Sequence, residues 1–89
     1  MNEIANRFSI SELQSILIFL QSGHSIANLI RDIENPANNT INPQYRRKFE
    51  NMLSRLYNIT AAEEQILIEF SNIDEPDLLS RLQHFYLEN

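Results

Sequence analysis

Few side chains in this sequence of 89 residues could carry out chemistry, and they lie far apart. The chain has two histidines, His24 and His84, and no cysteine. A zinc site needs several imidazole, thiolate or carboxylate ligands in one cluster, so we expect no metal site. The single glycine, Gly23, cannot supply the glycine-rich loops that bind phosphates or dinucleotides. We therefore expect no cofactor and no enzymatic activity.

Asp74, Glu75 and Asp77 form a local acidic group. A calcium-binding loop would need alternating oxygen ligands and a glycine at its sharp turn, and this segment lacks both features. Acidic residues at the start of a helix complement the positive end of the helix dipole. That role explains the group without a bound ion.

Charge is divided unevenly along the chain. Arg46, Arg47 and Lys48 are consecutive, Arg55 lies further along, and residues 59 to 80 contain six acids and no base. Such runs are typical of solvated helix faces, but they also fit a dipolar surface that recognises a charged protein. The candidate partner-binding residues are Arg46, Arg47, Lys48, Arg55, Glu63, Glu64 and Glu69.

The overall balance of charge limits the class of partner. The formal net charge is -5 and the pI is about 4.8, whereas nonspecific nucleic-acid binding normally requires a basic face. No apolar run approaches the ~20 residues that span a bilayer, and Met1 to Arg7 is too polar for a secretory signal. We expect a cytoplasmic protein that binds another protein, and a homodimer is an alternative. We expect neither nucleic-acid binding nor membrane insertion.

Two helices are predicted in the first half of the chain. Ser9 begins a capping box before an apolar helix over residues 10–22. Gly23 follows where a positive φ is needed to turn the chain. Ser25 then caps a second helix over residues 26–34.

Three further helices are predicted in the second half. Asn42 and Pro43 are a cap and a first helical residue, and Asn58 is expected to end that helix in the left-handed conformation. Thr60 repeats the capping box, and Asp74 or Glu75 caps the last helix. The predicted helices cover residues 43–57, residues 61–72 and a segment that starts near residue 75.

These elements predict an all-α fold, a compact antiparallel bundle of about five short helices. Residues 1–89 are expected to form one domain, with residues 1–8 as a loose N-terminal tail. Apolar residues that recur every three or four positions indicate the buried stripe of each helix. The predicted core residues are Leu13, Leu17, Leu20, Leu29, Phe49, Met52, Leu53, Leu56, Ile66, Leu67, Phe70, Leu79 and Leu82.

One local pattern is similar to a known family. Ser22 to Ile26 consists of a small residue, a glycine, a variable residue, a serine and an aliphatic residue, and Ile30 follows four residues later. With the order of helices down to Pro76 and Asp77, this resembles the cytoplasmic helical domain of type II secretion and type IV pilus inner-membrane platform proteins. The resemblance implies a compact helical bundle that docks other parts of a secretion or pilus machine.

The expected function is therefore a non-enzymatic protein–protein interaction module, such as an adaptor of an assembly. One alternative is a small inhibitor, immunity or regulatory protein that binds one protein target. Another is a helix-turn-helix DNA-binding regulator, in which Ser25 to Asn28 and Arg31 would face the major groove. The acidic balance of the chain disfavours this last alternative.

Overall fold

Helices make up almost all of the chain that the computed structural model describes, which is residues 3–37 and 41–87. Those residues contain no strand, so the all-α prediction is confirmed. The five predicted helices are present, and a short additional helix precedes them. The helices are α1 (Glu3–Arg7), α2 (Ile10–Gln21), α3 (Ile26–Glu34), α4 (Pro43–Leu56), α5 (Ala61–Ser71) and α6 (Glu75–Leu87).

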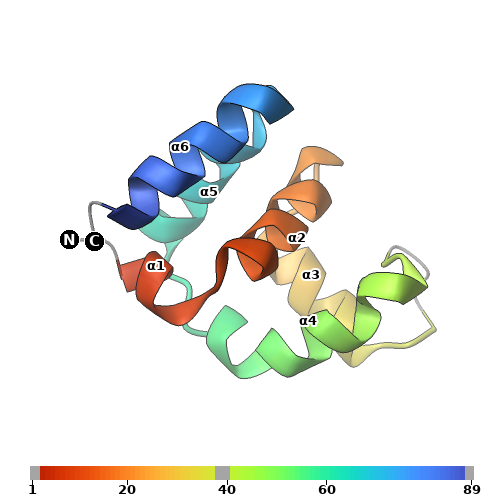
Figure 1. The fold of residues 1–89 in the computed structure, drawn as a ribbon. Coiled ribbons are helices and arrows are strands. Elements are labelled where there is room, and N and C mark those ends of the chain that lie inside the picture. Colours follow the sequence, from red (N-terminus) through yellow and green to blue (C-terminus); the bar gives the residue numbers. More distant parts are fainter. Residues whose placement is uncertain (1–2, 38–40, 88–89) are drawn as a thin grey trace.

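The helices surround α2, which crosses the middle of the molecule (Figure 1). Helices α5 and α6 lie side by side along one edge, and α4 lies across the opposite edge. The most extensive packing between helices joins α2 to α5 and α3 to α4. Because α2 is packed on several sides, its apolar residues form the centre of the core.

The helix starts follow the predicted caps. Ser9 and Thr60 form complete capping boxes, Ser25 forms one with an asparagine at the third helical position, and Asn42 caps α4. Gly23 has a φ of 84°, the positive value expected at the corner after α2. Local hydrogen bonding thus defines the beginning of each of these helices.

The end predicted for α4 is wrong. Asn58 does not adopt the left-handed conformation, because Gly23 alone has a positive φ among the described residues. Instead, the N–H groups of Asn58 and Ile59 donate to carbonyl groups three residues earlier, at 3.1 and 3.2 Å. These tighter bonds satisfy the last carbonyls of the helix without a left-handed residue.

Most of the predicted core is confirmed, with two corrections. Leu13, Leu17 and Met52 are fully buried, whereas Ile66 and Leu79 are 40% and 44% exposed. Both errors come from adjacent apolar pairs, in which helix geometry turns neighbouring side chains about 100° apart. Leu67 and Leu78 are the buried members of those pairs. Leu53 and Phe70 are only partly buried and pack against the core.

The prediction of a loose N-terminal tail is wrong for residues 3–8. Glu3–Arg7 forms helix α1, and Ile4 and Phe8 are 1% and 3% exposed. The Phe8 N–H donates to the carbonyl of Ile4 at 3.1 Å, so the two residues lie about one helical turn apart. The otherwise polar composition of the segment concealed this pair. The first two residues of the predicted tail lie outside the described residues.

Candidate functional site

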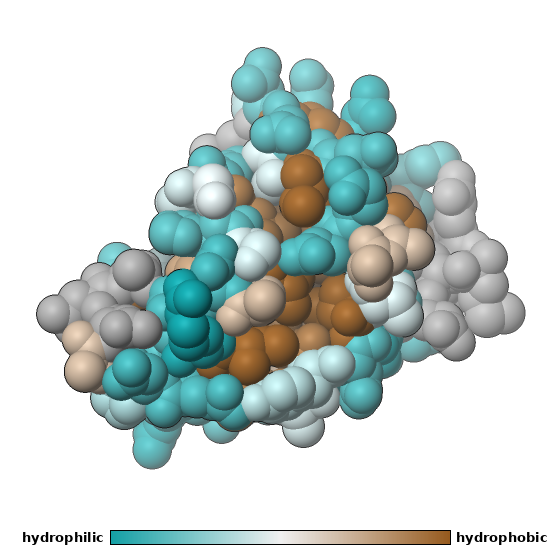
Figure 2. All heavy atoms as spheres, turned by 180° about the vertical axis from the view of Figure 1, so that it is seen from behind, coloured by the Kyte–Doolittle hydropathy of each residue, from teal (hydrophilic) through white to brown (hydrophobic). Residues whose placement is uncertain are grey.

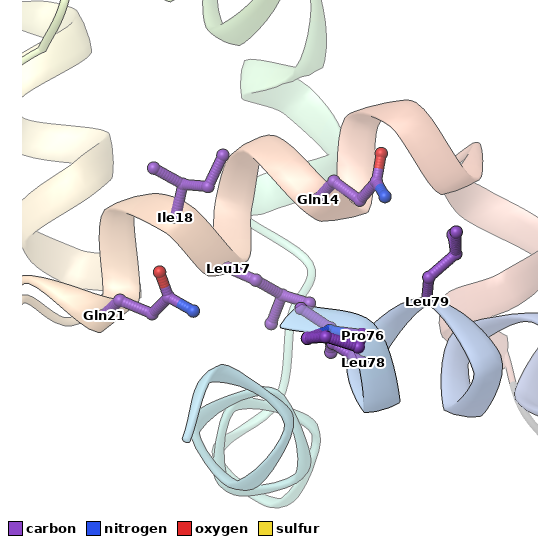
Figure 3. A pocket seen from close by; sticks show the side chains of 7 residues that line it. All are labelled: Gln14, Leu17, Ile18, Gln21, Pro76, Leu78 and Leu79. Atoms are coloured by element: carbon purple, nitrogen blue, oxygen red, sulfur yellow. The ribbon is translucent and has the colours of Figure 1, made fainter. Parts of the chain in front are cut away.

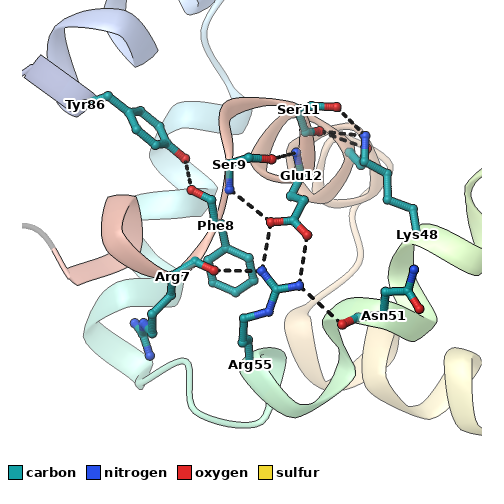
Figure 4. Close-up of polar contacts among 10 residues, drawn as sticks. Arg7, Phe8, Ser9, Ser11, Glu12, Lys48, Asn51, Arg55 and Tyr86 are labelled. Atoms are coloured by element: carbon teal, nitrogen blue, oxygen red, sulfur yellow. Dashed lines mark hydrogen bonds and ion pairs between the residues drawn. The ribbon is translucent and has the colours of Figure 1, made fainter.

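Arg55, one of the predicted partner-binding residues, lies at the centre of an internal polar cluster (Figure 4). Its guanidinium donates to both carboxylate oxygens of Glu12 at 2.8 and 2.9 Å, and to the backbone carbonyl of Arg7 at 2.8 Å. Its Cζ atom also lies 5.4 Å from the centre of the Phe8 ring. Arg55 therefore joins α4 to the junction of α1 and α2, and we call this group the Arg55 cluster.

The electrostatics of the Arg55 cluster favour the charged forms of its ion pair. The hydrogen bonds from Arg55 and the Ser9 N–H together hold the pKa of Glu12 below its usual value, against the effect of burial. The Tyr86 hydroxyl donates to the carbonyl of Phe8 at 2.7 Å, which ties α6 to the same junction. Burial and the nearby carboxylate of Glu12 raise the pKa of Tyr86 to about 12, so that hydroxyl remains a donor at neutral pH.

The other two partly buried basic candidates also join helices. Arg46 donates to the carbonyls of Asp32 and Ile33 at 3.2 and 2.9 Å, near the C-terminal end of α3. A cation at that position interacts favourably with the negative end of the helix dipole. Lys48 donates to the carbonyl of Ser11 at 3.1 Å, which links α4 to α2.

Two acidic candidates on α5 are likewise engaged within the fold. Glu63 completes the capping box of α5 and pairs with Arg7 at 2.6 Å. Burial raises the pKa of Glu63, but the hydrogen bonds from Thr60 and Arg7 outweigh burial and leave that pKa below its usual value. Glu64 accepts a hydrogen bond from the Ile26 N–H at 2.8 Å, so a carboxylate of α5 holds the first turn of α3.

Only two of the seven candidates remain exposed and without such a contact in the described part of the chain, Arg47 and Glu69. They lie on different helices, α4 and α5. The predicted candidates are thus not brought together as one surface. The sequence could not reveal this, since a charge run has the same composition whether its side chains face solvent or neighbouring helices.

A surface hollow lies between α2 and the start of α6, and we call it the α2–α6 groove (Figure 3). It has a volume of about 590 Å³. Ile18 on α2 and Leu79 on α6 are 50% and 44% exposed and line it from opposite walls. Its described lining residues are Gln14, Leu17, Ile18, Gln21, Pro76, Leu78 and Leu79, and none of these carries a charge.

Apolar residues reach the surface beyond this groove as well. Ile18 also borders a smaller hollow of about 210 Å³, where Phe19 and Phe49 meet residues at the start of α4. Figure 2 shows apolar atoms in the centre of the rear face, in a hollow framed by hydrophilic side chains. Sequence reasoning missed these features; the only signal for the groove was the uncharged stretch from Leu13 to Gln21.

The histidines are placed apart. His24 stacks on the ring of Phe19 with centroids 4.7 Å apart, whereas His84 lies on α6 beside a hollow that Phe70 and Arg81 also line. No group of three or more potential metal ligands occurs within residues 3–37 and 41–87.

In the same ranges, no helix has both the length and the apolar character that crossing a membrane requires.

Comparison with known proteins found no matching family model, no matching curated protein and no matching solved structure. The conclusions about the site therefore rest on its own geometry.

Proposed function

We propose that this protein is a non-enzymatic helical interaction module whose docking surface is the α2–α6 groove. One observation carries the proposal. Ile18 and Leu79, two large aliphatic side chains, are about half exposed and line one hollow whose described lining residues are all uncharged. Apolar hollows rimmed by polar residues mark binding surfaces more often than chance would place them.

The energetics of the groove support this role. Removing apolar surface from water contributes roughly 25 cal/mol per Å², and Ile18, Leu79 and Pro76 retain such surface in the isolated chain. A partner that covers these three side chains gains this term at a surface whose described lining is uncharged. The charges predicted to bind a partner offer less, because most of them already hold the helices together.

Two expectations from the sequence suggest the class of partner. The resemblance to platform proteins favours an adaptor of a secretion or pilus machine, and an inhibitor of one protein target is the alternative. A DNA-binding role is disfavoured by α3, the helix that would enter the major groove. The Ile26 N–H at its start bonds to the Glu64 carboxylate, which would repel phosphates.

The test is affinity capture from extracts of the organism of origin, followed by mass spectrometry. The bait is the wild-type chain, with Ile18→Gln plus Leu79→Gln as the groove variant and Arg47→Ala as the control. We expect a protein that the wild type and the control retain and the groove variant loses. Circular dichroism verifies that each variant remains folded.

Other outcomes decide between the alternatives. Secretion or pilus components would support the adaptor role, and a toxin or an enzyme would support the inhibitor role. Retention of the same proteins by the groove variant would contradict the groove as docking surface. Capture of DNA alone, with affinity that falls steeply as salt rises, would contradict the whole proposal.

A further inference from the structure

We infer that the α2–α6 groove accepts a basic amphipathic helix of another protein. This inference rests on the proposed function and adds the chemistry of the occupant. It depends on the spacing of the residues that line the two walls and on the charges around one end of the groove.

The wall contributed by α2 has the spacing of a helix-packing face. Gln14, Leu17, Ile18 and Gln21 stand at positions i, i+3, i+4 and i+7, the stripe that one helix presents to another. The opposite wall includes Pro76 and Leu79, which are three residues apart on α6. Two such ridges leave a trough into which a third helix can pack its own apolar stripe.

The charges around the groove determine which helix fits. The α2 wall is neutral, since residues 13–21 contain no charged side chain. At the other wall, Pro76 stands between Asp74 and Asp77, both exposed. These carboxylates lie within about one helical turn of Pro76, closer than the Debye length of roughly 8 Å at physiological salt.

The sequence places no lysine or arginine near this negative end, since residues 59–80 contain none. The nearest base on α6 in the sequence, Arg81, borders a different hollow with Phe70 and His84. On the neighbouring α5, Glu69 is exposed as well. A helix with lysines or arginines beside its apolar stripe would meet complementary charge here, whereas an acidic helix would be repelled.

The same charges disfavour a second copy of this chain as the occupant. A two-fold dimer buries the same patch of both chains in one interface, and the described lining of the groove offers no basic residue to pair with the acids of the other copy. Each chain also carries a formal net charge of -5, which adds long-range repulsion. The occupant is therefore a different protein segment with basic flanks.

The experiment uses two designed helical peptides of about four turns, both with leucines at i, i+3, i+4 and i+7. One carries lysines beside the apolar stripe, and the other carries glutamates at the same positions. Fluorescence anisotropy measures binding of each to the full chain. We expect the basic peptide to bind about tenfold more tightly or better, with an advantage that shrinks as salt rises.

Two variants assign the binding to the groove. Leu79→Gln should weaken the basic peptide about tenfold, roughly 1.4 kcal/mol. Asp74→Asn plus Asp77→Asn should reduce the preference for the basic peptide by several-fold, and asparagine at position 74 retains the ability to cap α6. Arg47→Ala is the control and should leave both affinities unchanged.

Three results of the peptide experiment would overturn the inference. They are equal binding of the two peptides, no binding of either, and a basic peptide whose affinity Leu79→Gln leaves unchanged. A wild-type dimer in sedimentation that Leu79→Gln dissociates would also overturn it, because a second copy would then occupy the groove. If the capture experiment still loses its partner in the groove variant, the proposed function stands and only the basic helix is rejected.

Discussion

The two halves of α2 have opposite chemistry although they belong to one helix. At its N-terminal end, Glu12 pairs with Arg55 of α4, and the carbonyl of Ser11 accepts a hydrogen bond from Lys48, also of α4. From Leu13 to Gln21 the helix carries no charge, and its outer side lines the α2–α6 groove. One end is fastened to its neighbours by charged hydrogen bonds, and the other leaves apolar surface open.

This difference separates the charged contacts that join the helices from the apolar surface that remains exposed. Polar groups in the Arg55 cluster have partners, and the described residues contain no buried side-chain nitrogen or oxygen without one. Such groups gain little from a further partner, because each would first lose the bonds it has. Surface that is apolar and only half covered still has free energy to gain from binding.

The largest effect is expected inside α6. Leu82 is fully buried, so Leu82→Ala should lower the free energy of unfolding by about 2–5 kcal/mol through lost transfer energy and a cavity. Leu79 faces the groove, and Leu79→Ala should cost about 1 kcal/mol or less. Urea unfolding of both variants measures the difference. Equal losses would show that the groove wall is part of the core.

A somewhat smaller effect is expected for the Arg55 cluster. Arg55→Ala removes bonds to Glu12 and Arg7 and should cost about 1–3 kcal/mol, as for hydrogen bonds to charged groups. Arg47→Ala on the same helix changes an exposed side chain and should stay within about 0.5 kcal/mol. Thermal unfolding compares them. Similar melting temperatures would mean that the cluster contributes nothing to fastening α2.

The C-terminal end of α2 depends on its corner rather than on charge. Gly23 has a φ of 84°, and beyond its two chain neighbours no atom lies within 4 Å of an added Cβ. Gly23→Val should therefore cost about 1–2 kcal/mol from backbone strain alone, and Gly23→Asn should cost less, since asparagine tolerates this conformation. Calorimetry would contradict the assignment of the corner if valine and glycine gave the same melting temperature.

The smallest effect is a dependence on acid. The pKa of Glu12 is lowered in the fold from its usual 4.5, chiefly by the hydrogen bond from Arg55. The resulting stability is complete above that pH and is lost as the pH falls through the lowered folded value. Glu12→Gln should therefore flatten the fall of the melting temperature below about pH 4.5. The change is expected to be under about 1 kcal/mol, because the pair is partly exposed. An unchanged acid profile would contradict this account.

Local features of the sequence predicted the helices well. Ser9, Thr60 and Gly23 act within a few residues of themselves, so their roles could be inferred from spacing. The prediction of a left-handed Asn58 was wrong because a helix can also end with tighter hydrogen bonds, and sequence spacing does not distinguish the two endings. Ile4 and Phe8 were missed because their burial depends on helices that come later in the chain.

The sequence by itself determined the all-α fold, the capped helix starts, the corner at Gly23 and most of the core, because each follows from periodicity or from bonds between near neighbours. Only the tertiary structure decided what the charged residues do. Arg55 binds Glu12, which is 43 positions away in the sequence, and Glu64 binds Ile26, which is 38 positions away. No local sequence pattern encodes contacts over such separations. The α2–α6 groove is likewise a product of packing, since its walls come from opposite ends of the chain and exist only once α6 lies beside α2.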